Sequence, residues 1–265
     1  MTDLGGKQAF GTGTDDGVDE RDERPGQAPR DLTSVRIATY NVHSCVGIDA
    51  KFSPERIAEV IRGLECDVVG LQEVGWHHRG EIGLDQFDFL ARSTGMQAFP
   101  GPTKHNDRAH YGNALLTNLP VRSVRSLDLS VGNREPRGAI DADVEVGGTA
   151  VRVIAAHLGL DPWERNTQIS RILHAVEWSE HRPTIFLGDL NEWRGRSPRI
   201  RRLHHTFPDC AAPRSFHARM PALRLDRIFV TGDLLLSGFE VVRTTLTRRA
   251  SDHLPVRATI ALKPR

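Results

Sequence analysis

The sequence predicts an α/β protein whose sheets are mixed and partly antiparallel. Short apolar strands alternate with amphipathic helices early in the chain, and from residue 112 onward several strands follow one another directly. The pair Gly147-Gly148 between two of these strands is a strong hairpin signal. A purely parallel, doubly wound sheet would not contain such hairpins.

Periodicity places the individual elements. A helix over 53–64 is predicted because Ser53 can cap it, Pro54 suits the first helical position and apolar residues recur at helical spacing. Further helices are predicted over 85–95 and 163–178. Apolar runs bounded by turn residues predict strands over 35–42, 67–74, 112–118, 120–129, 138–146, 149–158, 183–191, 225–230, 238–244 and 255–262.

The first 33 residues differ in composition from the rest. They are rich in Gly, Asp, Thr and Pro and poor in large apolar groups, so they bury too little surface to offset their ordering entropy. We predict a disordered tail over 1–33 and a single domain over 34–265. Residues 1–31 hold 4 of the 35 basic and 8 of the 34 acidic residues, which leaves the remainder at +5. This mild basicity suits a phosphate-bearing substrate but falls short of a nucleic-acid footprint.

The cysteine count favours a reducing compartment. The three cysteines, Cys45, Cys66 and Cys210, have no paired spacing, which argues against a disulfide framework and a zinc site. No signal peptide and no membrane span are visible, so the sequence predicts a cytoplasmic protein. Its oligomeric state is not predicted.

Polar side chains stand at the ends of six predicted strands. Taken singly they have ordinary explanations, because Asn and Asp are turn residues and a lone buried histidine is usually a satisfied core residue. Six such ends together indicate that strand ends converge on one polar site. The residues are Asn41, Glu73, His157, Asp189 with Asn191, Asp226, and Asp252 with His253.

The residue types at these ends favour a hard divalent cation. Carboxylate and amide oxygens with imidazoles, and without thiolates, suit Mg²⁺ or Mn²⁺. Such an ion neutralises a phosphate while a carboxylate takes a proton from the attacking water and imidazoles hold the developing charge. The pattern therefore predicts hydrolysis of a phosphate ester.

Eight short motifs in register resemble the endonuclease/exonuclease/phosphatase superfamily, which includes DNase I, AP endonucleases, neutral sphingomyelinases and inositol polyphosphate 5-phosphatases. Any one of the motifs is weak, but their order between residues 37 and 256 is specific. The resemblance implies a four-layered α/β/β/α sandwich with two mixed, mostly antiparallel sheets and the site at one end. The motifs are TYNVHS, LQEV, YGNALLT, EPRG, AAHLGL, GDLNE, LDRIFV and SDHLPV.

The resemblance also implies which residues bind the metal ion and which residue activates the attacking water. Glu73, assisted by Asn41, would bind Mg²⁺ or Mn²⁺, and Asp252 would lie near the ion. Asp189 would orient or deprotonate the attacking water. His253 is the second candidate for the base.

Other matched positions imply contacts with the phosphate. His157 and His253 would bind phosphate oxygens and stabilise the pentacovalent state, with Asp226 orienting His253. The remaining phosphate contacts implied are Asn191, Tyr111, Asn113 and Arg137.

One departure from the family pattern bears on the substrate. AP endonucleases carry a second carboxylate two residues after the Asn, and His43 stands at that position here. We therefore rank a phosphodiesterase of a small molecule or lipid headgroup above a DNA or RNA nuclease. A catalytically inactive binding domain is the third alternative, although every core position holds a residue competent for chemistry.

Two basic stretches and three tryptophans have open interpretations. The stretches 192–208 and 103–111 are either solvated faces or walls that attract an anionic substrate. Trp76, Trp163 and Trp193 could stack a base or contact a lipid headgroup, and for Trp163 core packing is the simpler interpretation.

Overall fold

The computed structural model describes residues 34–75, 84–106 and 109–264. The tail predicted over 1–33 and Trp76 lie outside these residues, so the structure does not test the interpretations given for them. None of the helices in the described ranges is long and apolar enough to cross a membrane.

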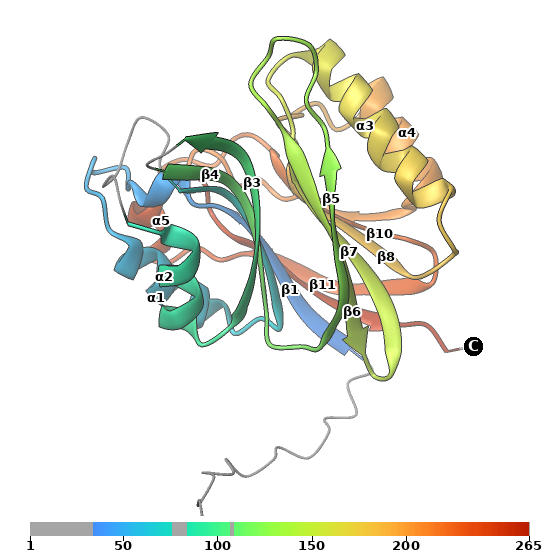
Figure 1. The fold of residues 1–265 in the computed structure, drawn as a ribbon, viewed down its shortest axis with the longest axis horizontal. Coiled ribbons are helices and arrows are strands. Elements are labelled where there is room, and N and C mark those ends of the chain that lie inside the picture. The colour runs from blue at the N-terminus through green and yellow to red at the C-terminus, as the bar shows by residue number, and fades with distance from the viewer. Residues whose placement is uncertain (1–33, 76–83, 107–108, 265) are drawn as a thin grey trace, which may run out of the picture. The chain divides into compact units, whose positions relative to one another are not determined.

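Two six-stranded sheets face each other in the described part of the chain (Figure 1). The first has the order β11 (Leu234–Val241), β12 (Val256–Leu262), β1 (Ser34–Asn41), β2 (Val68–Gly75), β4 (Ala109–Thr117) and β3 (Gln97–Asn106). The second has the order β5 (Val121–Asp128), β6 (Gly138–Val146), β7 (Thr149–His157), β8 (Thr184–Asp189), β10 (Asp226–Val230) and β9 (Asp209–Ala211). Among these strands β1–β2 and β7–β8 pair in parallel, and the other pairs are antiparallel.

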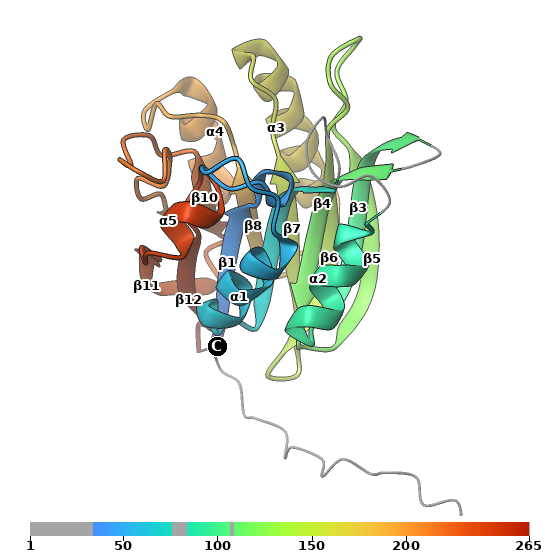
Figure 2. The same ribbon diagram turned by 90° about the vertical axis from the view of Figure 1, so that its left-hand side faces the viewer.

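Helices cover the outer faces of the two sheets, as Figures 1 and 2 show. α1 (Pro54–Leu64) and α2 (Gln86–Thr94) pack on the first sheet. α3 (Pro162–Glu177) and α4 (Pro198–Thr206) pack on the second. The short helices η1 (His43–Cys45) and α5 (Thr247–Ala250) lie in connections of the first sheet. The predicted four-layered α/β/β/α sandwich is confirmed.

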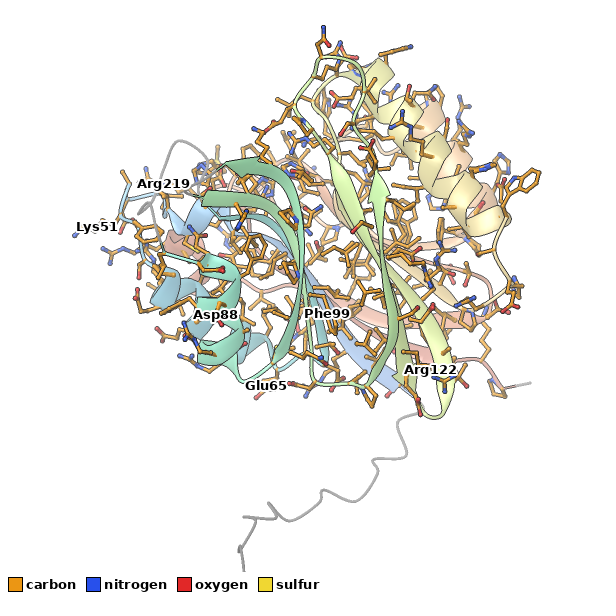
Figure 3. All side chains as sticks on the ribbon, viewed as in Figure 1. Lys51, Glu65, Asp88, Phe99, Arg122 and Arg219 are labelled. Atoms are coloured by element: carbon orange, nitrogen blue, oxygen red, sulfur yellow. The ribbon has the colours of Figure 1, made fainter. Side chains whose placement is uncertain are left out.

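Three apolar clusters hold these layers together. Side chains from both sheets meet in a central cluster, which Phe99 borders (Figure 3). Strand β1 shows why the layers form, because Ile37 points into this cluster while the adjacent Ala38 and Tyr40 pack under α1 and α2. A strand buried on both faces supplies two layers at once.

The structure adds elements that the periodicity did not predict. β3 contains Pro100, Gly101 and Pro102, which argue against a strand, and they are tolerated because β3 is an edge strand. α4 lies within the basic stretch 192–208, where Ser197 caps the helix and Pro198 begins it. The short β9 also went unpredicted, and β11 begins four residues earlier than the predicted strand over 238–244.

Candidate active site

The second sheet places three site residues side by side. In register, Asp189 at the end of β8 stands opposite His157 on β7 and Asp226 on β10. Residues directly opposite on neighbouring strands share a face of the sheet. Asp189 and Asp226 are fully buried or nearly so, and His157 is buried as well. Residues separated by up to 69 positions in sequence thus become neighbours because three strands end at the same edge.

Gly188 allows Asp189 to take its position. Its φ of +148° is one that L side chains rarely adopt, and a Cβ atom there would collide with the backbone carbonyl of Ala156. A glycine is therefore required immediately before the carboxylate.

The first sheet contributes Asn41 and Glu73 from the ends of the parallel strands β1 and β2. Asn41 Nδ2 donates to Glu73 Oε1 at 2.8 Å and to Asp189 Oδ2 at 3.1 Å, so one amide joins the two sheets. Glu73 has a φ of +57° and lies where the register between β2 and β4 shifts. Such bulges redirect side chains beside functional sites.

Tyr111 on β4 lies next to Glu73. Burial and the Glu73 carboxylate, to which the phenol is also hydrogen-bonded, raise the pKa of Tyr111. Its hydroxyl therefore keeps its proton at neutral pH and acts as a hydrogen-bond donor.

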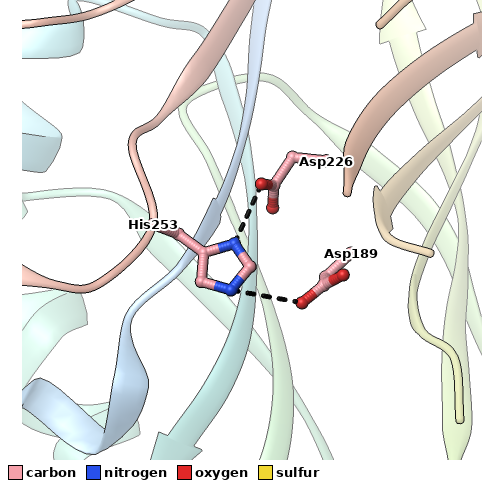
Figure 4. A group of neighbouring side chains, drawn as sticks. All are labelled: Asp189, Asp226 and His253. Carbon is pink, nitrogen blue, oxygen red and sulfur yellow. Dashed lines mark hydrogen bonds and ion pairs between the residues drawn. The ribbon is translucent and has the colours of Figure 1, made fainter. Parts of the chain in front are cut away.

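His253 joins the two aspartates of the second sheet (Figure 4). Its Nδ1 lies 2.9 Å from Asp226 Oδ2, and its Nε2 lies 3.6 Å from Asp189 Oδ2. Burial disfavours the charged imidazole, but Asp226 and Asp189 outweigh it and raise the pKa of His253 to about 10. Burial also raises the pKa of Asp189, to about 6, although His253 opposes the shift. At neutral pH the arrangement is an imidazolium between two carboxylates.

His157, unlike His253, is neutral at neutral pH. Burial, together with the cationic Arg137 and His253, holds the pKa of His157 well below 6.5. Arg137 Nη1 lies 2.9 Å from His157 Nδ1, and since a guanidinium can only donate, that nitrogen accepts. The proton of the neutral ring is then on Nε2, which lies 3.6 Å from Asp189 Oδ2.

Asn191 reaches the same place from the loop after β8. Its Nδ2 donates to Leu158 O at 2.9 Å. The same nitrogen lies 3.2 Å from His157 Nε2, but this is not a hydrogen bond because that ring nitrogen carries the proton. Its φ of +50° is the left-handed conformation that asparagine tolerates. The Asp189 carboxylate accepts the backbone N–H of Asn191 at 2.9 Å, which fixes this turn.

Two predicted residues lie at the margin of this group. Asn113 is buried and donates to Gly138 O, next to Arg137. Asp252 has a side chain that is 26% exposed, and its Oδ1 lies 3.7 Å from His43 Nδ1. The backbone N–H of His43 donates to Asn41 Oδ1, so His43 links Asp252 to the centre.

Residues that sequence reasoning missed support the charged groups. Ser215 Oγ donates to Asp226 Oδ2, and Ser251 Oγ donates to Asn41 O at 2.8 Å while accepting His253 N–H at 3.2 Å. Glu135 pairs with Arg137 at 2.8 Å. Ser251 and Glu135 stand inside quoted motifs and could have been found there, whereas nothing in the sequence marks Ser215.

The donor atoms at this end of the sheets fit a hard divalent cation. Asp189, Asp226 and His253 offer ligand atoms within 4.8 Å of one another, which would form one possible metal position. There, however, Asp226 Oδ2 already accepts His253 Nδ1–H and Ser215 Oγ–H. The partly exposed Glu73 carboxylate beside Asn41 has the oxygen character that Mg²⁺ or Mn²⁺ prefers.

The sandwich and the polar edge define a class of protein, the DNase I-like fold. The family model described as "Endonuclease/Exonuclease/phosphatase family" matches residues 38–253, and the chain belongs to this family. The description of the family names endonucleases, exonucleases and phosphatases.

The chain is also similar to known proteins in sequence and in fold. The uncharacterized protein YbhP of Escherichia coli is 27% identical over 246 residues, covering 86% of this chain and 97% of YbhP. An endonuclease/exonuclease/phosphatase from Beutenbergia cavernae superposes with a TM-score of 0.69 at 22% identity. The superposition covers 86% of this chain and 72% of the Beutenbergia cavernae chain. The mannosyl-6-phosphatase Bt3783 of Bacteroides thetaiotaomicron superposes with a TM-score of 0.67 at 15% identity, covering 86% and 100%.

Proposed function

We propose that this protein is a divalent-metal-dependent phosphoesterase that hydrolyses a phosphodiester of a small molecule or lipid headgroup. The observation that carries the proposal is Asp189, whose carboxylate lies within 3.6 Å of the Nε2 atoms of His157 and His253 and accepts from Asn41. A carboxylate between two imidazoles of different charge state is suited to activate water beside a phosphate.

In the proposed reaction, the ionised Asp189 orients the attacking water and accepts its proton. The His253 imidazolium, held by Asp226, donates to a phosphate oxygen from Nε2. The neutral His157, fixed by Arg137, offers its Nε2–H to the same group. Charge that builds on the phosphate oxygens therefore meets preorganised donors. His253 as the base is the less favoured assignment, because Asp226 and Asp189 hold it protonated.

We assign the proposed metal to Glu73, with Asn41 beside it and Asp252 at the margin. When bound, Mg²⁺ or Mn²⁺ would neutralise phosphate charge and stabilise the leaving oxygen. Tyr111 and Arg137 would line the phosphate pocket, together with Asn113 and Asn191.

A nuclease on the same scaffold is the alternative. The exposed arginines after Asn191 favour it, since Arg194, Arg196 and Arg201 all extend from the loop and helix that follow the site. The absence of a carboxylate at His43 favours the smaller substrate.

A substrate panel tests the proposal. With Mg²⁺ or Mn²⁺, we expect turnover of bis-p-nitrophenyl phosphate or of a phospholipid headgroup, and little turnover of plasmid DNA. Cleavage of DNA with a steep salt dependence would contradict the proposal and show that the protein is a nuclease. A protein that binds metal but turns over no ester would be a binding domain.

A further inference from the structure

Large apolar side chains are exposed at the end of the sheets where the site lies. α3 begins five residues after His157, and α4 begins nine residues after Asp189, so both connections start at the site. These connections and the first turn of α3 carry Leu160, Trp163 and Trp193, which are 72%, 64% and 47% exposed. The interpretation of Trp163 as a core residue is therefore wrong.

A buried ion pair contacts two of these residues, Leu160 and Trp193. Arg165 is 1% exposed, donates to Gly159 O at 3.1 Å and Leu160 O at 2.5 Å, and lies 3.6 Å from the buried Glu192 carboxylate. The Trp193 ring lies over the same guanidinium, 5.9 Å from ring centroid to Cζ. The buried Arg165 thus helps to position Leu160 and Trp193, whose side chains remain exposed to solvent.

The surroundings of this apolar group carry more basic than acidic side chains, and Asp161, which stands between Leu160 and Trp163, lies 3.5 Å from Arg134. Glu192 is the one acidic residue in 192–208. Its carboxylate forms ion pairs with Arg199, at 2.6 Å, and with Arg165. The exposed side chains of Arg194, Arg196, Arg201 and Arg202 remain toward solvent. Arg202 Nη1 donates to Ser170 Oγ and ties α4 to α3, which lie side by side (Figure 1).

We propose that this rim, defined as Leu160, Trp163 and Trp193 with Arg194, Arg196, Arg201 and Arg202, docks on the surface of an anionic lipid bilayer. Indole and aliphatic side chains beside cations are the composition of interfacial membrane binding. An exposed leucine has no role in stacking bases, which favours a bilayer over a single-stranded nucleic acid.

The rim has a consequence for the substrate, and this consequence rests on the proposed function. Docking would turn the strand ends that carry His157 and Asp189 toward lipid headgroups. A phosphoester presented at the bilayer surface would then reach the site without leaving the membrane.

Vesicle binding tests the proposal apart from catalysis. We expect the full chain to sediment with vesicles of phosphatidylcholine and phosphatidylserine, more weakly with phosphatidylcholine alone, and less at high salt. The double variant Leu160→Ala/Trp163→Ala should weaken binding at least about tenfold, because apolar area at the interface is lost. Trp178→Ala is the matched control, since Trp178 is 81% exposed at the opposite end of α3.

Several results would overturn the proposal. Binding by the double variant equal to wild type, or an equal loss in Trp178→Ala, would remove the rim from membrane docking. If wild type binds a single-stranded oligonucleotide but no vesicles, and the double variant loses the affinity for the oligonucleotide, the rim is a nucleic-acid surface.

A charge variant and a soluble substrate keep the outcomes separate. Arg194→Glu/Arg196→Glu should lower binding to anionic vesicles alone, and unchanged binding would contradict the proposal. Rates with soluble bis-p-nitrophenyl phosphate should not change in either double variant. If wild type binds vesicles but hydrolyses no ester, the proposed function fails and the docking surface stands.

Discussion

At the residue scale, Asp189 contacts side chains from both sheets. Asn41 reaches it from β1, His157 from β7 and His253 from the segment before β12. Burial raises the pKa of this carboxyl group, the His253 charge and the hydrogen bond from Asn41 lower it, and the Asp226 carboxylate raises it. One side chain therefore combines a fixed position with an ionised state at neutral pH.

We expect Asp189→Asn and His253→Ala each to lower the rate of ester hydrolysis at least about a hundredfold, the usual size of acid–base and electrostatic contributions. Steady-state rates on the substrate turned over in the panel would measure this. Asp88→Asn, on the outer face of α2 (Figure 3), is the control and should keep its activity. A rate like that of wild type in either variant would exclude that residue from the mechanism.

Glu73→Gln should weaken metal binding by about tenfold or more, because a carboxylate charge is removed from a hard-cation site. Calorimetric titration with Mn²⁺ reads this without any substrate. Glu65→Gln serves as control, since the Glu65 side chain is 68% exposed (Figure 3). An unchanged titration for Glu73→Gln would reject its role as ligand.

At the element scale, two strand ends of the site contain a residue with positive φ, a conformation that is unfavourable for residues other than glycine. Gly188 and the bulge at Glu73 both occur where a strand must stop and present a carboxylate. Glu73 carries local backbone strain at this point, whereas glycine at position 188 avoids the strain that an L side chain would meet there.

Gly188→Ala should destabilise the fold by roughly 2–4 kcal/mol, because the unfavourable φ and the collision with Ala156 O add. Gly63→Ala is the matched control: it lies in α1 with open space around it, so alanine should stabilise by up to about 1 kcal/mol. Urea denaturation would give both values. Equal effects of the two substitutions would show that position 188 does not require glycine.

At the scale of the whole molecule, buried charges connect the second sheet to α3. Asp141 on β6 accepts two hydrogen bonds from Arg152 on β7, at 2.6 and 2.8 Å, and also binds Arg125 on β5. Arg152 in turn donates to Ala175 O at 2.9 Å. Burial opposes ionisation of Asp141, but the hydrogen bonds from Arg152 and Arg125 outweigh it and lower its pKa.

A lowered carboxyl pKa predicts the direction of acid sensitivity. The stabilisation is fully present above the unfolded-state pKa of about 3.9 and is lost as pH falls toward the folded-state pKa. Urea midpoints measured from pH 6 down to pH 3 should fall steeply at the acidic end. Asp141→Asn should be less stable at pH 6 and show a shallower fall. The same slope in Asp141→Asn as in wild type would contradict this role, and Asp88→Asn should leave the slope unchanged.

The sequence by itself determined the α/β class, most strands and the identity of the polar residues at the strand ends. Apolar periodicity is local, so it identifies elements such as α1, but it failed at β3, whose prolines and glycine are tolerated only at a sheet edge. The family resemblance supplied the four-layered arrangement, which hydrophobic patterning leaves open.

Only the tertiary structure decided which side chains touch and which remain exposed. The charge states of His157 and His253 depend on neighbours from other strands, and Ser215 enters the site through a loop that no motif marks. Trp163 is apolar in sequence yet exposed in the fold. Contacts between distant segments set burial and electrostatics, and the sequence around each residue does not contain them.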